Sequence, residues 1–199
     1  MANRPGEVIP APDSDLCLAF ANTRYWRGSA TPTEELQTPE DVLRWAASAQ
    51  RLPPAMLKRL APGAAVFDAA IGVRETIHRC FAATASGRAP DAADLAGLNA
   101  GLAQAPPRQR VVPGGWDVGA PAPSVATLLA PVLWSAADLL VGTQLARVRL
   151  CENPDCGWLF LDGSKSGNRR WCSMSACGNR AKAHRHYLRQ KAVPTAKEG

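Results

Sequence analysis

Four cysteines in the C-terminal part of the chain constrain its fold more than any other feature. They form two Cys-x4-Cys pairs separated by fifteen residues: Cys151, Cys156, Cys172 and Cys177. Each pair lets one tight turn present two sulfur atoms, and four thiolates complete the tetrahedral shell that Zn²⁺ prefers. Because a segment this short cannot bury a hydrophobic core of its own, we expect a bound zinc ion to hold it together.

Two disulfide bonds are the alternative use of these four cysteines. Disulfides are rare in a reducing cytosol, and the residues from Met1 to Glu7 lack the apolar run that would indicate a signal peptide. We therefore expect a cytoplasmic protein with free thiols. A catalytic zinc ion is disfavoured because four cysteine ligands leave no open position for water. A redox role stays open as a hypothesis, since oxidation of the thiolates would release the metal.

The sequence contains further histidine and cysteine residues that we do not expect to bind metal. His184 and His186 follow the second pair, but four cysteines already complete the tetrahedron, so we expect both histidines to face a groove or solvent. Cys17 and Cys80 lie on apolar faces of predicted helices and are interpreted as core thiols.

Positive charge is concentrated in the same part of the chain as the four cysteines. Residues 1–146 carry 12 basic and 13 acidic side chains, a net charge of −1, whereas residues 147–199 carry 11 basic and 4 acidic side chains, a net of +7. Between Lys165 and Lys191 there are eight basic residues and no acidic one. Such a block suits a polyanion, although a solvated face that only keeps the protein soluble would have the same composition.

The basic residues after the second cysteine pair recur at helical spacing, which places Lys182, Arg185 and Arg189 on one helix face. Such a helix can lie in the major groove of duplex DNA, where arginine contacts guanine and lysine neutralises phosphate. Asn179 could read adenine or fix the turn at the neighbouring cysteine, and the sequence leaves both open. The predicted nucleic-acid contacts are Arg169, Arg170, Asn179, Arg180, Lys182, Arg185 and Arg189.

A short loop precedes the second cysteine pair. Residues 163–168 are rich in glycine and serine, and we expect a mobile loop that orders on phosphate. Arg169 and Arg170 at its end are better placed to hold phosphate than to read bases. Upstream, residues 158–161 are apolar and predict a short strand beside the zinc ion.

Residues 1–146 are predicted to form a helical body. The segment Thr38-Pro39-Glu40-Asp41 is a strong helix start, and apolar residues recur every three or four positions from 64 to 85. Asp13 or Ser14 could cap a first short helix, and Asp91 or Asp94 a later one. A β-hairpin over residues 109–118 is the only β element expected in the body.

The run of apolar residues from 125 to 146 is long enough to suggest a membrane span. Asp138 would cost about 2.5 to 3.5 kcal/mol at the centre of a bilayer, so a buried core helix that starts after Ser124 is the better interpretation. Pro131 should bend this helix or split it. We therefore expect no membrane partner.

Taken together, these patterns predict a mainly α fold with a small β-hairpin. A helical domain over residues 1–146 would precede a four-cysteine zinc finger over residues 147–191, made of a short β-hairpin and a basic helix, and a flexible tail over residues 192–199. No flexible Gly/Ser linker separates the two parts, so the finger should dock firmly. The body should nevertheless keep its fold when the finger is disrupted, because its helices bury their own apolar faces.

The body carries no recognisable catalytic constellation. We find no pairing of a nucleophile with a base and no paired carboxylates, and His78 among apolar neighbours indicates a core or helix-surface residue. An enzyme is therefore disfavoured. A polar and aromatic cluster could line a pocket for a small-molecule effector, or could form only a structural turn: Asn22, Thr23, Arg24, Tyr25 and Trp26.

The cysteine-containing segments carry a family resemblance. Cys151-Glu-Asn-Pro-Asp-Cys156, Arg169-Arg-Trp-Cys172 and Cys177-Gly-Asn-Arg180 resemble the CGNR zinc finger, which is named after the last tetrapeptide. The segment Leu16-Cys-Leu-Ala-Phe-Ala-Asn22-Thr23 is similar to the ABATE domain, which usually precedes this finger and is described as a stress-induced transcription regulator. The resemblance implies a bacterial transcription regulator that binds DNA.

Three functions remain open at this point. A zinc-containing DNA-binding transcription regulator, with the N-terminal domain sensing a ligand or partner, is favoured. The alternatives are an RNA-binding zinc protein and a zinc-stapled protein-interaction module that binds no nucleic acid. RNA readers usually offer aromatic side chains for base stacking, and most aromatic residues of this finger are needed for its own packing. A symmetric homodimer would suit a regulator.

Overall fold

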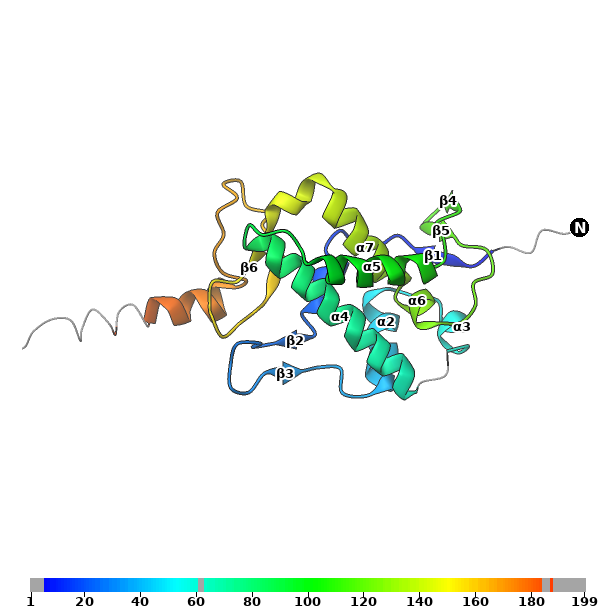
Figure 1. Ribbon diagram of the computed structural model, residues 1–199, viewed down its shortest axis with the longest axis horizontal. Helices are drawn as coiled ribbons and strands as arrows, with labels where there is room; N and C mark the ends of the chain where they lie inside the picture. Colours follow the sequence, from blue (N-terminus) through cyan, green and yellow to red (C-terminus); the bar gives the residue numbers. More distant parts are fainter. Residues whose placement is uncertain (1–5, 61–62, 184–186, 188–199) are drawn as a thin grey trace, which may run out of the picture.

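The computed structural model describes residues 6–60, 63–183 and 187. It confirms a mainly helical body followed by a small cysteine-rich finger (Figure 1). The helices of the body are α1 (Leu16–Ala21), α2 (Pro39–Ala49), α3 (Pro54–Leu57), α4 (Ala64–Ala85), α5 (Ala92–Gln104), α6 (Val125–Leu128) and α7 (Ala130–Val141). The strands are β1 (Val8–Pro10), β2 (Arg24–Tyr25), β3 (Thr33–Glu34), β4 (Arg110–Val112), β5 (Gly115–Asp117), β6 (Val148–Leu150) and β7 (Leu159–Leu161). Two short helical turns complete the list, the 3-10 turn η1 (Thr143–Arg147) and the π-helical turn η2 (Met174–Gly178).

The core of the body forms where α1, α4 and α7 meet. Helix α1 is almost wholly buried, with Cys17 and Phe20 fully inaccessible to solvent. Helix α7 buries Val132 and Ala136, and α4 contributes Ile77 to the same core. The apolar run near residue 130 is thus a core helix, as the sequence predicts. Over the described ranges, no helix has both the length and the apolar character needed to cross a membrane.

Most of the predicted helix starts are present. The Thr38 hydroxyl accepts a hydrogen bond from the Asp41 amide while the Asp41 carboxylate accepts one from the Thr38 amide, which forms a capping box for α2. Asp91 caps α5 and Ser124 caps α6 through side-chain oxygens. Pro131 lies in the first turn of α7, where its missing N–H is harmless, and the predicted long helix is therefore split into α6 and α7.

The start of the first helix differs from the prediction. Neither Asp13 nor Ser14 caps α1; Asp15 occupies the N-cap position, and its side chain makes no capping hydrogen bond. Tertiary packing supports this short helix instead. The Cys17 amide donates to the Ser135 hydroxyl of α7 at 3.1 Å, so one of the free amides at the start of α1 is satisfied across the core.

The predicted hairpin forms, but it is not the only β element of the body. Strands β4 and β5 pair antiparallel around Gly114, whose φ of 86° suits the tight turn. The N-terminal strand β1 adds to β5, which gives the order β1-β5-β4, and β2 pairs with β3 elsewhere. The prediction of a single hairpin was wrong because these strands are two or three residues long, too short for an alternating pattern.

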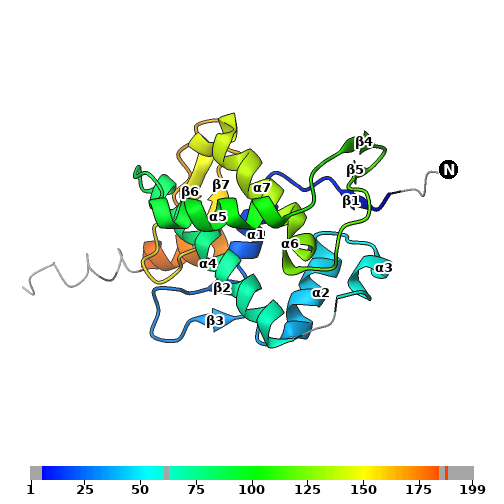
Figure 2. The ribbon, with the colours of Figure 1, turned by 45° about the vertical axis from the view of Figure 1, so that its right-hand side comes forward.

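The finger and the β1-β5-β4 sheet lie at opposite ends of the molecule in both views (Figures 1 and 2). Strands β6 and β7 pair antiparallel and carry the finger. Their residues Val148 and Leu159 are buried in the same apolar cluster as the body helices. The hairpin of the finger is therefore part of the main core, although the sequence suggests a boundary at residue 147.

A buried arginine ties α4 to the segment that approaches the finger. Arg74 is 1% exposed, and its guanidinium group contacts Glu34 of β3 at 2.5 and 2.7 Å and the Thr23 hydroxyl at 3.3 Å. It also contacts Glu75 at 2.9 Å. Glu75 also pairs with Arg27, but Glu34 has no second cationic partner among the described residues, so loss of Arg74 would leave the partly buried Glu34 carboxylate without compensation.

We predict that Arg74→Met destabilises the fold by about 2 to 4 kcal/mol, because it retains volume but leaves the partly buried Glu34 carboxylate unpaired. Arg79→Met on the same helix is the matched control. Arg79 pairs with Asp94 at 2.6 Å, but its side chain is 55% exposed, so its loss should cost at most about 1 kcal/mol. Urea unfolding followed by circular dichroism measures both. Equal destabilisation by the two variants would contradict a structural role for the buried network.

Candidate metal centre and basic finger

The four predicted cysteines come together at one point of the finger. Cys151 follows β6 directly and Cys177 lies in η2, while Cys156 and Cys172 lie in the connecting turns. All four sulfur atoms lie within 4.8 Å of one another. The sulfur of Cys172 is 3.7 Å from that of Cys156 and 3.7 Å from that of Cys177.

These distances match metal coordination rather than disulfide bonding. A tetrahedron with metal–sulfur bonds of about 2.3 Å has edges of about 3.8 Å, whereas bonded sulfurs lie about 2.05 Å apart. All six cysteines of the chain are free. The cluster therefore has the arrangement expected of a metal site with four soft ligands, three of them buried, and such a site would form a closed shell rather than a reactive position.

Burial makes the thiolates costly unless a cation compensates them. Burial, with nearby thiolate charge adding to it, raises the pKa of Cys172 to about 12 and also raises the pKa of Cys156. For Cys177 burial acts in the same direction, but hydrogen bonds from Asn153 and the neighbouring cysteines outweigh it and lower the pKa. Metal binding must displace thiol protons at this centre, so metal and protons compete for the same sulfur atoms.

Asn153 joins the two cysteine pairs. We call residues 151–156 the first cysteine turn. Asn153 is 8% exposed; its Nδ2 donates to the Cys177 sulfur at 3.5 Å and its Oδ1 accepts from the Asp155 amide at 3.2 Å. It therefore holds the first cysteine turn in shape and supports a ligand from the second pair. This role was not predicted from the sequence, although an Asn-Pro inside the first pair signals a structured turn.

Two arginines predicted to bind phosphate have intramolecular partners. The Arg169 guanidinium group lies 4.7 Å from the centre of the Phe160 ring and donates to the carbonyl oxygens of Trp171, at 2.8 Å, and Cys172. Arg170 lies over the Trp171 ring at 5.3 Å and pairs with Glu152. Arg169 thus holds the backbone at Cys172, whereas the Arg170 side chain contacts the half-buried Trp171 ring and an exposed carboxylate.

The loop before the second pair is anchored rather than free. Asp162 is fully buried, and its carboxylate accepts hydrogen bonds from the amides of Ser164 and Arg169, at 2.9 and 2.8 Å. Hydrogen bonding by Ser164 and the Arg169 amide lowers the pKa of Asp162 to about 2. The Gly167 carbonyl accepts from Arg149 at 3.0 Å. The expectation of a mobile loop overlooked Asp162, which fixes both ends.

A helix begins inside the second cysteine pair, between Cys172 and Cys177. Ser173 caps it by accepting from the Ala176 amide, and η2 continues into an α-helical segment; we call residues 174–183 the finger helix. Asn179 donates to the Ser175 carbonyl at 3.3 Å, and Lys182 is exposed. The described part of the helix thus presents Asn179, Arg180 and Lys182 to solvent. The predicted contacts Arg185 and Arg189, His184, His186 and the predicted tail lie outside the described residues.

The body binds the first cysteine turn through residues 26–28, a short segment that we call the strap. The amide of Arg27 donates to the Cys156 carbonyl and that of Gly28 to the Asp155 carbonyl, both at 3.2 Å. Any side chain at position 28 would collide with backbone, since a Cβ there would lie 2.0 Å from the Pro154 carbonyl oxygen. The metal centre is therefore fixed to the body by backbone contacts that only glycine permits.

Side chains add to this junction. The Arg27 guanidinium group pairs with Glu75 of α4 at 2.6 Å. Nε2 of His78, also on α4, donates to the Gly157 carbonyl at 2.9 Å, and burial together with the charge of Arg27 lowers the pKa of His78. His78 therefore helps to hold the finger against α4. The sequence could not reveal this role, because a single histidine on an apolar helix face does not indicate its partner.

The cluster at residues 22–26 lies at the same junction. The Asn22 side chain accepts from the Leu159 amide at 3.0 Å and donates to the Leu159 carbonyl at 2.8 Å. Thr23 is buried, and Trp26, with a φ of 54°, packs beside the cysteines while the Arg180 guanidinium group lies 4.5 Å from its ring centre. These contacts join body and finger; an effector pocket lined by the cluster stays a prediction.

The fold and the cysteine cluster together define a helical protein with a C-terminal finger of the zinc-finger type. The family described as ABATE, "Putative stress-induced transcription regulator", matches residues 14–143, and the CGNR zinc finger matches residues 147–190. The first match covers more than half of the chain, so the chain belongs to the ABATE family, and the order of the two matches confirms the resemblance seen in the sequence. A search of curated proteins found no match.

We predict that Asn153→Asp weakens metal binding about 10- to 100-fold, because it removes the donor to the Cys177 sulfur and places a negative charge beside the thiolates. Asn168→Asp, on the exposed loop of the same finger, introduces the same charge away from the metal and should change the affinity by less than about threefold. Competition with a chromophoric chelator at pH 7 gives both constants. Similar affinities for the two variants would show that Asn153 does not support the centre.

Proposed function

We propose that this protein is a zinc-dependent regulator that binds duplex DNA through its C-terminal finger. The observation that carries the proposal is the combination of a closed four-sulfur site with a net charge of +7 over residues 147–199. The metal would supply the stability that the short finger lacks, and the surrounding cations would supply affinity for phosphate. The stress-regulator description of the family supports the same function.

Zinc is the metal that suits these ligands best. Four thiolates in a tetrahedral arrangement favour Zn²⁺ over hard cations such as Mg²⁺, which take oxygen ligands. A closed shell of four cysteines also fits a structural role rather than catalysis. We also propose that the protein is not an enzyme. The regulator description of its family and the closed four-cysteine site support this proposal.

We predict about one zinc ion per chain in protein purified without added metal, and loss of that zinc in Cys172→Ser, because three thiolates cannot close the tetrahedral shell. Cys80→Ser, at a buried cysteine far along the chain from the cluster, is the control and should keep its zinc. Elemental analysis together with thiol counting measures this. Stoichiometric disulfides without metal would contradict the proposal.

The proposed DNA-contact surface combines the finger helix with the arginines beside it. Lys182 and Asn179 are exposed, and Arg180 follows the last cysteine turn. In this proposal Lys182, Arg180 and Arg170 neutralise phosphate, Arg185 and Arg189 extend the same face, and Asn179 reads a base edge. Arg169 acts mainly by positioning the backbone at Cys172.

The body would act as a sensor for a ligand or protein partner, with a homodimer as the regulatory unit. What supports a sensing role is the junction between the body and the finger, because a change at the strap would move the first cysteine turn. RNA remains the second candidate for the finger, favoured by Trp171 being only half-buried and therefore able to stack on a base.

We predict that the logarithm of DNA affinity falls linearly with the logarithm of salt concentration, by about 0.9 per neutralised phosphate, and that Lys182→Ala flattens this slope by about one unit. Lys58→Ala, at an exposed lysine of the body, should leave the slope unchanged. Fluorescence anisotropy with duplex DNA, single-stranded DNA and RNA at several salt concentrations tests the proposal. Equal slopes for the zinc-loaded wild type and Lys182→Ala would exclude Lys182, and preference for RNA would favour the second candidate.

A further inference from the structure

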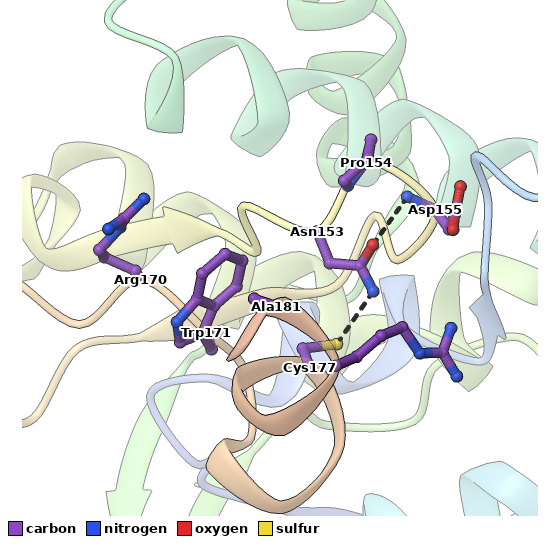
Figure 3. A pocket seen from close by; sticks show the side chains of 8 residues that line it. Asn153, Pro154, Asp155, Arg170, Trp171, Cys177 and Ala181 are labelled. Carbon is purple, nitrogen blue, oxygen red and sulfur yellow. Dashed lines mark hydrogen bonds between the residues drawn. The ribbon is translucent and has the colours of Figure 1, made fainter. Parts of the chain in front are cut away.

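A pocket with a volume of about 470 Å³ lies on the finger beside the metal centre. The first cysteine turn forms one wall, the finger helix another, and the segment before Cys172 a third (Figure 3). This volume lies within the range of small-molecule sites. Neither the structural role of the metal nor contact with a duplex backbone requires such a pocket.

The interior of the pocket suits a flat aromatic group. The half-buried Trp171 ring, Pro154 and the methyl group of Ala181 line it, and Figure 3 places Trp171 and Pro154 on different sides. Stacking on an exposed aromatic face is the usual way in which proteins hold an unpaired base. Asp155 is the only acidic residue among those lining the pocket, and a carboxylate can accept a hydrogen bond from a base amino group.

Two arginines give the same pocket an affinity for anions. Arg170 is paired with Glu152, but their side chains are 59% and 43% exposed, so a phosphate can replace the carboxylate at little cost. Arg180 stacks on Trp26, and within the described part of the chain it has no hydrogen-bond partner, which leaves its N–H groups available. Both arginines are exposed while Cys177 is buried, so an anion held by them stays at the mouth of the pocket, away from the thiolate.

We propose that this pocket binds a nucleoside monophosphate unit, with the base stacked on Trp171, the phosphate held by Arg170, and Arg180 adding positive charge on another part of the lining. The unit could be a free nucleotide or one unpaired residue of a nucleic acid strand, because both present the same base and phosphate. For the strand the inference rests on the proposed function, whereas binding of a free nucleotide does not depend on it.

Isothermal titration calorimetry of the full zinc-loaded chain tests the proposal with four probes: cytidine 5′-monophosphate, inorganic phosphate, a fully paired duplex, and the same duplex with a single-cytosine bulge. We expect the nucleotide to bind at least about tenfold more tightly than phosphate, or the bulged duplex to bind at least about tenfold more tightly than the paired one. The first result identifies a free nucleotide as the ligand, and the second identifies an unpaired residue.

Two matched variants separate binding in the pocket from binding that depends only on the positive charge of the finger. Ala181→Leu fills the pocket and should abolish the preference that the wild type shows, whereas Ala183→Leu, exposed on the same helix and outside the pocket, should keep it. Both keep every cation, so binding of the paired duplex should stay within about twofold. If neither preference exists in the wild type, or if Ala181→Leu and Ala183→Leu behave alike, the proposal is overturned.

Arg170→Gln provides a second test if Ala181→Leu fails to retain zinc. It should weaken binding of cytidine 5′-monophosphate at least about fivefold while binding of cytidine stays unchanged, since only the nucleotide carries a phosphate. Unchanged nucleotide binding would contradict the proposal. A wild type that binds the nucleotide but neither duplex would instead contradict the proposed DNA-binding function and leave the pocket proposal standing, so the two failures can be told apart.

Discussion

Four sulfur atoms within 4.8 Å of one another are the constraint on which the C-terminal part of the structure depends. Buried thiols are costly to ionise and the resulting thiolates repel each other, so a divalent cation would stabilise the arrangement. Local contacts prepare the centre: Asn153 supports Cys177, Arg169 binds the Cys172 carbonyl, and Asp162 fixes the preceding loop. These contacts help to hold the four cysteines in position.

The same centre is fixed to the helical body. Asn22 holds Leu159 through two hydrogen bonds, the strap at residues 26–28 binds the first cysteine turn, and His78 binds Gly157. Because Leu159 also lies in the main core, the β6–β7 hairpin should remain with the body when metal is lost. In the proposed zinc protein the cysteine turns and the finger helix would depend on metal, which would place the boundary between the metal-independent and metal-dependent parts within the finger. The prediction that the body keeps its fold without the finger applies to a body that includes this hairpin.

The basic residues of the finger have two roles that the sequence does not separate. Some stabilise the finger itself, and others remain exposed. The Arg169 guanidinium group contacts the Phe160 ring and donates hydrogen bonds to backbone carbonyls, so it stabilises the finger itself. Lys182 has an exposed side chain, and Arg180 stacks on Trp26 of the body while remaining exposed. A count of basic residues therefore overstates the number of cations available to a polyanion. The contact between Arg180 and Trp26 also places a body residue next to the proposed nucleic-acid surface.

The sequence by itself determined the four clustered cysteines, the helical class and most helix starts, because spacing of cysteines, capping residues and apolar periodicity are local signals. Thr38, Asp91 and Ser124 cap helices as expected, and Pro131 splits the long apolar segment. Tertiary structure alone decided the rest. Strands β1, β2 and β3 are too short to leave a pattern, and the roles of Asn22, His78 and Arg74 depend on partners between 40 and 137 residues away. Such contacts arise only when the core brings distant segments together, and no local signal in the sequence encodes them.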